Sequence, residues 1–376
     1  MSAAMATIPL VDLKAQYRAI GPEIEAAIAR VLERQSFINA GETRAFEEEF
    51  ASFCEAPEAI GVSNGTTAIE LILNALGVGA GDEVITVPHT FMATVGAVLR
   101  TGATPVLVDV DEATWTMSPE QVARAVTPRT RAILPVHLYG NPADVPAIAA
   151  AAPGIPIVED AAQAHGARYH GRAVGSDSAA ASYSFYPGKT LGAYGDAGAV
   201  TTADPELALR LRRLRDHGRY GAKYEHASVG TNARMSEIQA AVLRTKLPHL
   251  RDWVAARQRL CRLYEERLAG SDVRLQRVEP WAEHTWHLFV LLHPDRDRIA
   301  AELKGRGIST GVHYPIPVHR QPAMADASHR VQGGELPVTD ALAATCLSLP
   351  IYPELGDGGV ARVTEAVHDV LAGAHV

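Results

Sequence analysis

Apolar positions in the first half of the chain alternate between two spacings. Between Ile20 and Phe53 they recur at helical intervals, and the pattern breaks around Ser36–Gly41. This spacing predicts two helices joined by a turn. Short β-rich runs then follow, separated by segments long enough for helices: residues 83–87, 104–109, 131–136, 155–159 and 181–185. That rhythm is typical of βαβ units and predicts a largely parallel sheet.

The pattern changes in the second half of the chain. From Pro205 to Leu250 the apolar spacing turns helical, and a domain boundary is expected near Pro248–Trp253. This division predicts a large domain over residues 1–250 and a smaller one over residues 251–376. The smaller domain is expected to be α+β, with these elements: helix 252–268, strand 287–292, helix 296–306 and a closing helix 359–372.

Composition and charge narrow the class of partner. The chain has 376 residues, of which 47% are hydrophobic and 21% charged, which is typical of a globular protein with a large core. Its net charge of -8 argues against nucleic acid or an anionic membrane as the main partner. No run of apolar residues is long enough to predict a membrane span. Small-molecule chemistry is therefore favoured.

The cysteines and the N-terminal segment bear on the compartment. Cys54, Cys261 and Cys346 are odd in number and far apart, with no CxxC pair. This usage favours a reducing, cytoplasmic compartment. The first residues lack a basic segment followed by a long apolar run, so no signal peptide is expected.

The segment from Ile155 to Val200 carries the most informative chemistry. An apolar run ends at Glu159 and Asp160, and the carboxyl ends of parallel strands are where such sheets bind ligands. The next predicted strand leads into a turn that holds Lys189. A carboxylate and a lysine so placed suit pyridoxal phosphate, because the lysine binds the cofactor aldehyde and the carboxylate keeps the pyridine nitrogen protonated. Taken singly, Asp160 could cap a helix and Lys189 could be a solvated turn residue.

Two nucleotide-binding motifs are incomplete. Gly188 and Lys189 resemble part of a P-loop, but that motif requires glycine where Tyr183 stands. Gly77 and Gly79 begin like a dinucleotide fingerprint, yet the required third glycine falls on Asp82. Neither nucleotide-binding loop is expected.

A phosphate site is predicted near residue 65. The residues Ser63 to Thr67 come immediately before a helical run, so backbone N–H groups and hydroxyls converge at a helix N-terminus. The alternative is that Ser63 or Asn64 only caps this helix.

Six segments together resemble the DegT/DnrJ/EryC1/StrS family of sugar aminotransferases: SNGTTAIEL, VPHTFMAT, LPVHLYG, VEDAAQAHGA, SFYPGKTLGAYGDAGAV and GTNARMSEIQAAVLRTKL. The similarity extends from about Ile8 to the C-terminus, and the motifs occur in the family's order. It implies an α/β protein of the type I, aspartate aminotransferase-like fold, with a mainly parallel central sheet and a smaller α+β C-terminal domain. It also implies pyridoxal 5′-phosphate as the cofactor.

The resemblance assigns roles to matching positions. Lys189 would form the Schiff base, Asp160 would bind the pyridine nitrogen, and Gln163 would bind the phenolic oxygen. The phosphate would be held by Gly65, Thr66 and Ser184. Phe91 would stack on the cofactor ring, although a core phenylalanine is the alternative.

The resemblance also implies a homodimer with shared active sites. Asn232 matches an asparagine that reaches the cofactor phosphate of the neighbouring subunit. It could equally belong to a loop before a helix capped by Ser236.

Substrate contacts are expected from two further segments. Arg219, Lys223 and Tyr224 form a basic and aromatic cluster suited to a nucleoside diphosphate, or else an exposed helix end. His313 and Tyr314 match a family turn placed near the sugar. No metal is expected, since His313 and His319 lack a third ligand at suitable spacing.

The implied activity is transfer of an amino group from L-glutamate to a nucleotide-linked keto-deoxysugar. The segment around His313 and Tyr314 most resembles relatives acting on thymidine-diphosphate-linked 3-keto-6-deoxyhexoses. A 4-keto sugar, an inosose-type substrate and a non-catalytic regulatory role remain alternatives. Lys189 argues against a dehydratase, in which histidine replaces the cofactor lysine.

Overall fold

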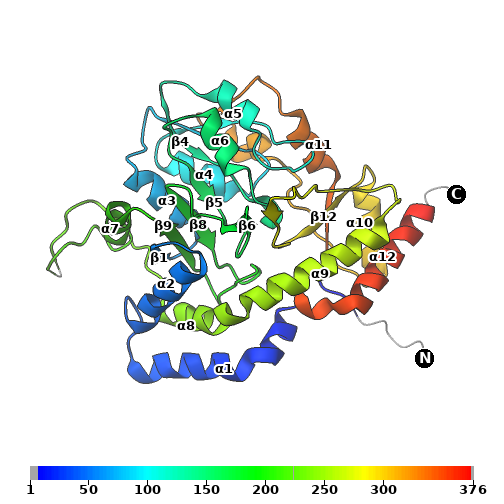
Figure 1. Cartoon of the computed structure of the whole chain (residues 1–376), viewed down its shortest axis with the longest axis horizontal. Coiled ribbons are helices and arrows are strands. Elements are labelled where there is room, and N and C mark those ends of the chain that lie inside the picture. Colours follow the sequence, from blue (N-terminus) through cyan, green and yellow to red (C-terminus); the bar gives the residue numbers. More distant parts are fainter. Residues whose placement is uncertain (1–6, 223, 374–376) are drawn as a thin grey trace.

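The computed structural model describes residues 7–222 and 224–373. It begins with the two predicted helices, α1 (Leu13–Arg34) and α2 (Gly41–Phe53), joined by a turn. Buried side chains of α1, among them Ile24 and Ala27, pack against α8 (Glu237–Lys246). Figure 1 shows α1 along one edge of the molecule, next to α8.

The central sheet contains all five predicted strands: β2 (Glu83–Thr86), β3 (Thr104–Leu107), β4 (Thr130–Leu134), β5 (Val158–Asp160) and β8 (Ala180–Ser184). Strands β3, β2 and β4 pair in parallel, as do β5 and β8. Parallel bridges from Ile133 to Ile157 and from Val136 to Asp160 join these two groups. The predicted parallel sheet is confirmed, and it brings the carboxyl ends of β4, β5 and β8 to one edge.

Two strands on the antiparallel side of this sheet were not predicted. They are β1 (Glu58–Val62) and β9 (Gly198–Thr202), and β9 pairs antiparallel with both β8 and β1. Their sequences, EAIGV and GAVTT, are short and contain glycine and alanine, so they lack a strong β pattern. Both strands are stabilised by pairs far apart in sequence.

Helices cover the sheet on both faces, as expected for an α/β fold: α3 (Gly65–Ala75), α4 (Met92–Arg100), α5 (Pro119–Ala125), α6 (Val145–Ala151) and α7 (Pro205–Leu214). Helix α3 is apolar on most of its surface because it contacts β8, β9, α4 and α7 together. Its buried position fixes the place of its N-terminus relative to the end of β8.

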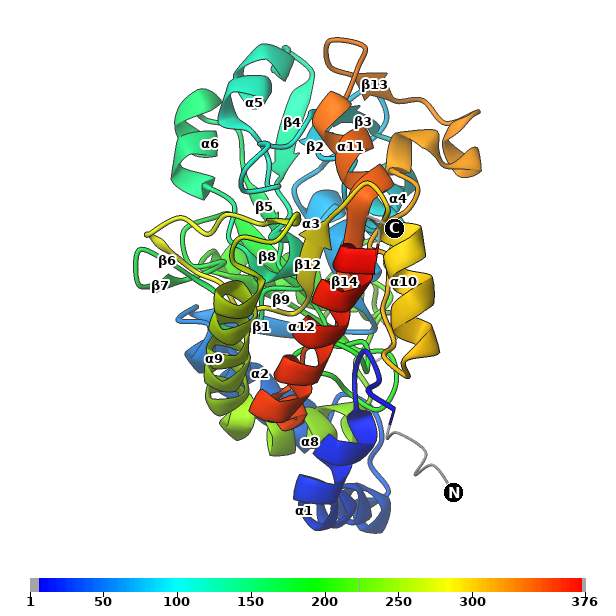
Figure 2. The ribbon, with the colours of Figure 1, turned by 90° about the vertical axis from the view of Figure 1, so that its right-hand side faces the viewer.

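The C-terminal portion forms a second antiparallel sheet of β10 (Arg274–Leu275), β12 (Phe289–Leu292) and β14 (Cys346–Leu349). The helices of this portion are α9 (Leu250–Leu268), α10 (Arg296–Gly305), α11 (Pro337–Thr345) and α12 (Gly356–Ala372). The predicted helices and the strand within 287–292 are confirmed, whereas β14 and α11 were not predicted. Helices α9 and α12 contact each other, and Figure 2 shows them side by side over β12 and β14.

Two sets of strand pairs link the N-terminal and C-terminal portions: one extends the large sheet and the other is a separate short sheet. Strand β13 (Arg330–Val331) pairs in parallel with β3, next to a cluster in which Val318 and Met324 pack against Val95. Strand β11 (Ala282–Glu283) pairs with β6 (Arg168–Tyr169), which in turn pairs with β7 (Arg172–Ala173). The domain boundary between residues 250 and 251 stays a prediction. A strand beyond this boundary, β13, pairs with β3 of the large sheet.

The helical pattern from Pro205 to Leu250 is not continuous in the structure. Between α7 and α8 lies a loop over residues 215–236, which turns at Gly218. Gly218 has a φ of 73°, and a Cβ there would meet the carbonyl oxygen of Ser228 at 1.8 Å. A side chain would therefore not fit at this turn, which lies four residues after the end of α7.

Within the described ranges, no helix is long and apolar enough to cross a membrane. The three cysteines are buried and unpaired.

Candidate active site

Asp160 lies at the carboxyl end of β5 and is only 5% exposed. Its Oδ2 accepts a hydrogen bond from the Thr94 hydroxyl at 2.7 Å, and its Oδ1 accepts one from the Ala162 N–H at 3.2 Å. The neighbouring Glu159 points to the other face of the strand, where it bonds His137 Nε2 at 2.8 Å. Of the two acids singled out in the sequence, Asp160 alone therefore faces this site.

Lys189 follows β8 on a tight turn, in which its N–H donates to the Tyr186 carbonyl at 2.8 Å. Burial lowers the pKa of Lys189 to about 8, and the negative charge of Asp160 opposes this shift. Roughly a tenth of the amine is therefore neutral at pH 7, far more than for an ordinary lysine. The two predicted catalytic side chains interact electrostatically, as their joint use requires.

Gln163 is held in one orientation by its neighbours. Its Oε1 accepts from the backbone N–H of Tyr139 at 2.6 Å, so its Nε2 points the other way and donates to the Tyr314 hydroxyl at 3.2 Å. The Phe91 ring lies 5.7 Å from the Tyr314 ring and is 57% exposed. This exposure makes the alternative of a core phenylalanine wrong.

The predicted phosphate residues meet at the N-terminus of α3. A Cβ on Gly65 would lie 2.7 Å from the Cβ of Ser184, so the start of α3 touches the end of β8. Asn64 caps the helix by accepting from the Thr67 N–H at 2.9 Å, and Thr66 lies half-buried in the first turn. The capping role and an anion site are compatible, because the first N–H groups of a helix have no partner within it.

His313 and Tyr314 join this cluster from the C-terminal portion. His313 Nδ1 bonds Ser348 Oγ at 2.8 Å, and burial together with the charge of Lys189 lowers the pKa of His313 to about 4. Burial and the negative charge of Asp160 raise the pKa of Tyr314. Both side chains are therefore uncharged at neutral pH, with His313 affected by the charge of Lys189 and Tyr314 by that of Asp160.

Known proteins identify the class of this site. A profile of the DegT/DnrJ/EryC1/StrS aminotransferase family matches residues 18–368. The chain belongs to this family. Membership of this family confirms the expected type I fold and the expected cofactor, pyridoxal 5′-phosphate. The chain is therefore a pyridoxal-phosphate-dependent aminotransferase.

Similar proteins match nearly the full length of the chain. The chain is 48% identical over 365 residues, 96% of each chain, to the dTDP-3-amino-3,4,6-trideoxy-alpha-D-glucose transaminase of Streptomyces venezuelae. It superposes with a TM-score of 0.94 on the crystal structure of S. venezuelae DesV in complex with a ketimine intermediate, at 48% identity and 97% and 98% coverage. It is also 50% identical over 351 residues, 93% and 95% of the two chains, to the erythromycin biosynthesis sensory transduction protein EryC1 of Saccharopolyspora erythraea.

Three predicted site residues of this aminotransferase lie apart from the cluster, in the loop between α7 and α8. Asn232 is exposed and accepts a hydrogen bond from Arg234 at 3.1 Å, and Arg219 pairs with Asp216 at 3.2 Å. Tyr224 is 83% exposed, while Lys223 lies outside the described residues. Figure 1 shows this loop extending from the body of the protein. Their roles stay predictions.

Two residues of the aminotransferase site were missed in the sequence. Thr94 orients Asp160 and lies one helical turn after Phe91, within a segment that the resemblance already included. Tyr139 is fully buried with a φ of 63°, and its hydroxyl bonds both His89 Nε2, at 2.9 Å, and the His313 carbonyl. Tyr139 thereby links the segments that carry Phe91, Gln163 and His313, a connection that no local pattern reveals.

Proposed function

We propose that this aminotransferase moves an amino group from L-glutamate to a thymidine-diphosphate-linked 3-keto-6-deoxyhexose, giving a 3-amino sugar nucleotide. The observation that carries the proposal is the convergence of Asp160, Gln163 and Lys189 with the His313–Tyr314 turn. The similarity to a transaminase named for a dTDP-3-amino sugar supports this choice of acceptor.

The residues present fit pyridoxal phosphate. The buried carboxylate of Asp160 is matched to a protonated ring nitrogen, and the exposed ring of Phe91 offers a flat apolar face. The close contact of Gly65 with Ser184 leaves a cradle for the phosphate at the start of α3. Thr66 supplies a further hydroxyl there. When bound, the cofactor supplies an aldehyde and an electron-withdrawing ring.

Each side chain then has a defined task. Asp160 holds a proton on the ring nitrogen, and its own orientation is fixed by Thr94 and Ala162. Gln163 donates from Nε2 toward the phenolic oxygen, because its Oε1 is already engaged by Tyr139. Lys189 Nζ, as a neutral amine, would accept the proton from the α-carbon of the donor and hold it for return, acting as general base and then as general acid. The same lysine would serve in the opposite order when the keto sugar is aminated.

The sugar is assigned to the turn at His313 and Tyr314. Because Nδ1 of His313 bonds Ser348, its Nε2 is left to bind a sugar hydroxyl, and the low pKa of His313 keeps that ring neutral. A mismatched hydroxyl at such a buried site would cost about 1–3 kcal/mol. Arg219 and Tyr224 are assigned to the nucleoside diphosphate.

A panel of acceptors tests the proposal. The holoenzyme is converted to its amino form with L-glutamate, freed of glutamate, and mixed with 3-keto and 4-keto dTDP-sugars and with an inosose. We expect the amino-form absorbance to disappear at least about tenfold faster with the 3-keto sugar. Faster reaction with a 4-keto sugar or an inosose would contradict the proposed acceptor but not the aminotransferase activity. No reaction with any acceptor or with glutamate would favour a regulatory protein.

The shared active site predicts complementation between two inactive variants. Lys189→Ala lacks the proton carrier, and Asn232→Ala lacks the phosphate ligand that we assign to the partner subunit. After subunit exchange, mixed dimers should regain activity, because one of their two sites contains both residues. The measurement is activity against mixing ratio, with exchange verified by mass spectrometry. Absence of recovery in exchanged dimers would place Asn232 outside the partner's site.

The lowered pKa of Lys189 predicts the pH dependence of cofactor uptake. The rate at which cofactor-free enzyme binds pyridoxal phosphate covalently should rise through a midpoint near pH 8, because only the neutral amine attacks an aldehyde. Stopped-flow absorbance measures this rate. Asp160→Asn should move the midpoint downward, since the carboxylate stabilises the ammonium form. A midpoint near the ordinary lysine pKa of about 10.4 would contradict this prediction.

Tyr139→Phe should weaken sugar binding more than it affects the cofactor. The variant keeps the backbone N–H that orients Gln163 but leaves His89 and the His313 carbonyl without their phenol partner. We expect kcat/KM for the sugar to fall about tenfold, from the loss of a buried hydrogen bond worth about 1–3 kcal/mol. Tyr264→Phe is the matched control, because its buried hydroxyl also bonds one carbonyl, that of Pro350 at 2.9 Å. An equal loss in both variants would indicate an effect on stability alone.

A further inference from the structure

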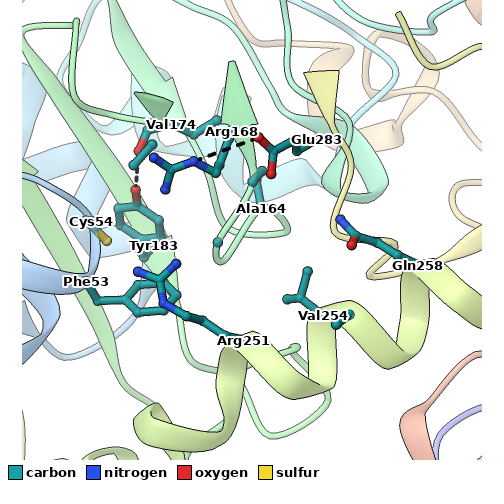
Figure 3. Close-up of a pocket in the computed structure, with 14 residues that line it drawn as sticks. Phe53, Cys54, Ala164, Arg168, Val174, Tyr183, Arg251, Val254, Gln258 and Glu283 are labelled. Atoms are coloured by element: carbon teal, nitrogen blue, oxygen red, sulfur yellow. Dashed lines mark hydrogen bonds and ion pairs between the residues drawn. The ribbon is translucent and has the colours of Figure 1, made fainter. Parts of the chain in front are cut away.

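A pocket lies behind the active-site segments, between α2, β8 and α9. Its volume is about 160 Å³, which matches a few water molecules or one small metabolite and is too small for a nucleotide. Ala164 and Tyr183 form part of its wall, one residue before His165 and Ser184 respectively. Figure 3 shows these side chains facing a common space with Val254 and Gln258 of α9.

One end of this pocket carries a cation whose charge is not neutralised by an ion pair. The Arg251 guanidinium lies 4.9 Å from the centre of the Phe53 ring, and it has no hydrogen bond or ion pair to any residue in 7–222 or 224–373. Arg168 also lines the pocket, but its guanidinium is engaged by Glu55 at 2.6 Å and by the Gly171 carbonyl at 2.9 Å. Arg168 and, more weakly, Arg251 lower the pKa of Glu55, but Glu55 pairs directly with Arg168, so Arg251 is the group available to bind an anion.

The opposite end carries acceptors. Glu283 forms a long ion pair with Arg168 at 3.9 Å, beyond hydrogen-bond distance, and its side chain is 53% exposed, so its carboxylate oxygens can still accept hydrogen bonds. Gln258 donates from Nε2 to the His284 carbonyl at 3.0 Å, which leaves Oε1 as an acceptor. Figure 3 shows Glu283 across the pocket from Arg251, and Gln258 further along α9. The wall between the two ends is apolar and includes Ala164 and Val254.

From this separation of charges we propose that the pocket binds a small zwitterion of the amino-acid class. Its carboxylate would bind Arg251 and its ammonium group would bind Glu283 and Gln258 Oε1, with a short apolar body along Val254. Guanidinium–carboxylate pairs are among the stronger hydrogen-bonded contacts, and a ligand with both charges complements both ends. This site is separate from the one where an amino donor reacts, and it does not depend on the identity of the sugar.

N,N-dimethylglycine is a suitable probe, because it has both charges but no primary amine to react with the cofactor. We expect saturable binding to the holoenzyme by calorimetry, with acetate and dimethylamine each binding at least about tenfold more weakly. Unchanged absorbance of the bound cofactor will show that the probe stays out of the active site.

Two variants and a control complete the test. Arg251→Gln and Glu283→Gln should each weaken dimethylglycine binding about tenfold or more, whereas Arg262→Gln, on α9 but outside the pocket, should not. Both changes are at polar side chains near the surface, so folding is checked by the melting temperature. No saturable binding up to about 50 mM, or equal binding by Arg251→Gln, would overturn the proposal. Equal affinity for acetate and dimethylglycine would show that the pocket binds simple anions, which would contradict the proposal of a zwitterion site.

Discussion

Lys189→Ala is expected to abolish turnover while leaving the fold and cofactor binding in place. The variant removes the amine that carries the proton between donor and cofactor, a contribution of at least about 10³-fold. The phosphate cradle at Gly65 and Ser184, and the carboxylate of Asp160, do not depend on that amine. The measurements are glutamate-dependent turnover and, separately, cofactor retained after gel filtration.

Lys304→Ala is the matched control for this experiment. Lys304 is an exposed residue near the end of α10 and has no contact with the site described above. It should retain full turnover, and circular dichroism should show that both variants are folded. Turnover by Lys189→Ala at the rate of the control would remove Lys189 from the mechanism and would contradict the proposed function itself.

Much of this site could be predicted because its key residues lie close together in sequence and at strand ends. Asp160, Gln163, Ser184 and Lys189 all fall between Val158 and Thr190, and a parallel arrangement of β5 and β8 is enough to bring them together. The helix-capping pattern at Asn64 similarly marks the start of α3. The local hydrophobic pattern and the topology of the sheet predict the same arrangement here, and the predicted fold is confirmed.

The residues that were missed depend on contacts between distant segments. Tyr139 bonds to residues 50 and 174 positions away in sequence, and the antiparallel position of β9 follows from pairing with β1. Strand β13 likewise pairs with β3 after more than two hundred intervening residues. Hydrophobic spacing reports the local element but not its partner, so these features required the structure. The pocket beside Arg251 has the same origin, because its two ends come from α9 and β11.

Asp160→Asn should fold normally and lose about 10²–10³-fold in turnover, the usual effect of removing one group that stabilises a developing charge. Asparagine fits the hydrogen bonds of this position. Its carbonyl oxygen can accept from the Ala162 N–H, and its amide can donate to the Thr94 hydroxyl, which in turn can donate to Thr90 at 2.8 Å. What the amide lacks is the negative charge that keeps the cofactor's ring nitrogen protonated.

Glu159→Gln provides the contrasting result. Glu159 is equally buried but bonds His137 and the Gly175 N–H on the other face of β5. Its amide variant should lower the melting temperature, because a buried charge-assisted pair is weakened, while turnover per folded molecule stays close to that of the unmodified enzyme. Turnover and melting temperature, measured on both variants, therefore separate an electrostatic role from a structural one. If the two amide variants lost turnover equally, the charge of Asp160 would have no specific part in the reaction, and the carboxylate would be a structural ligand of Thr94 and Ala162.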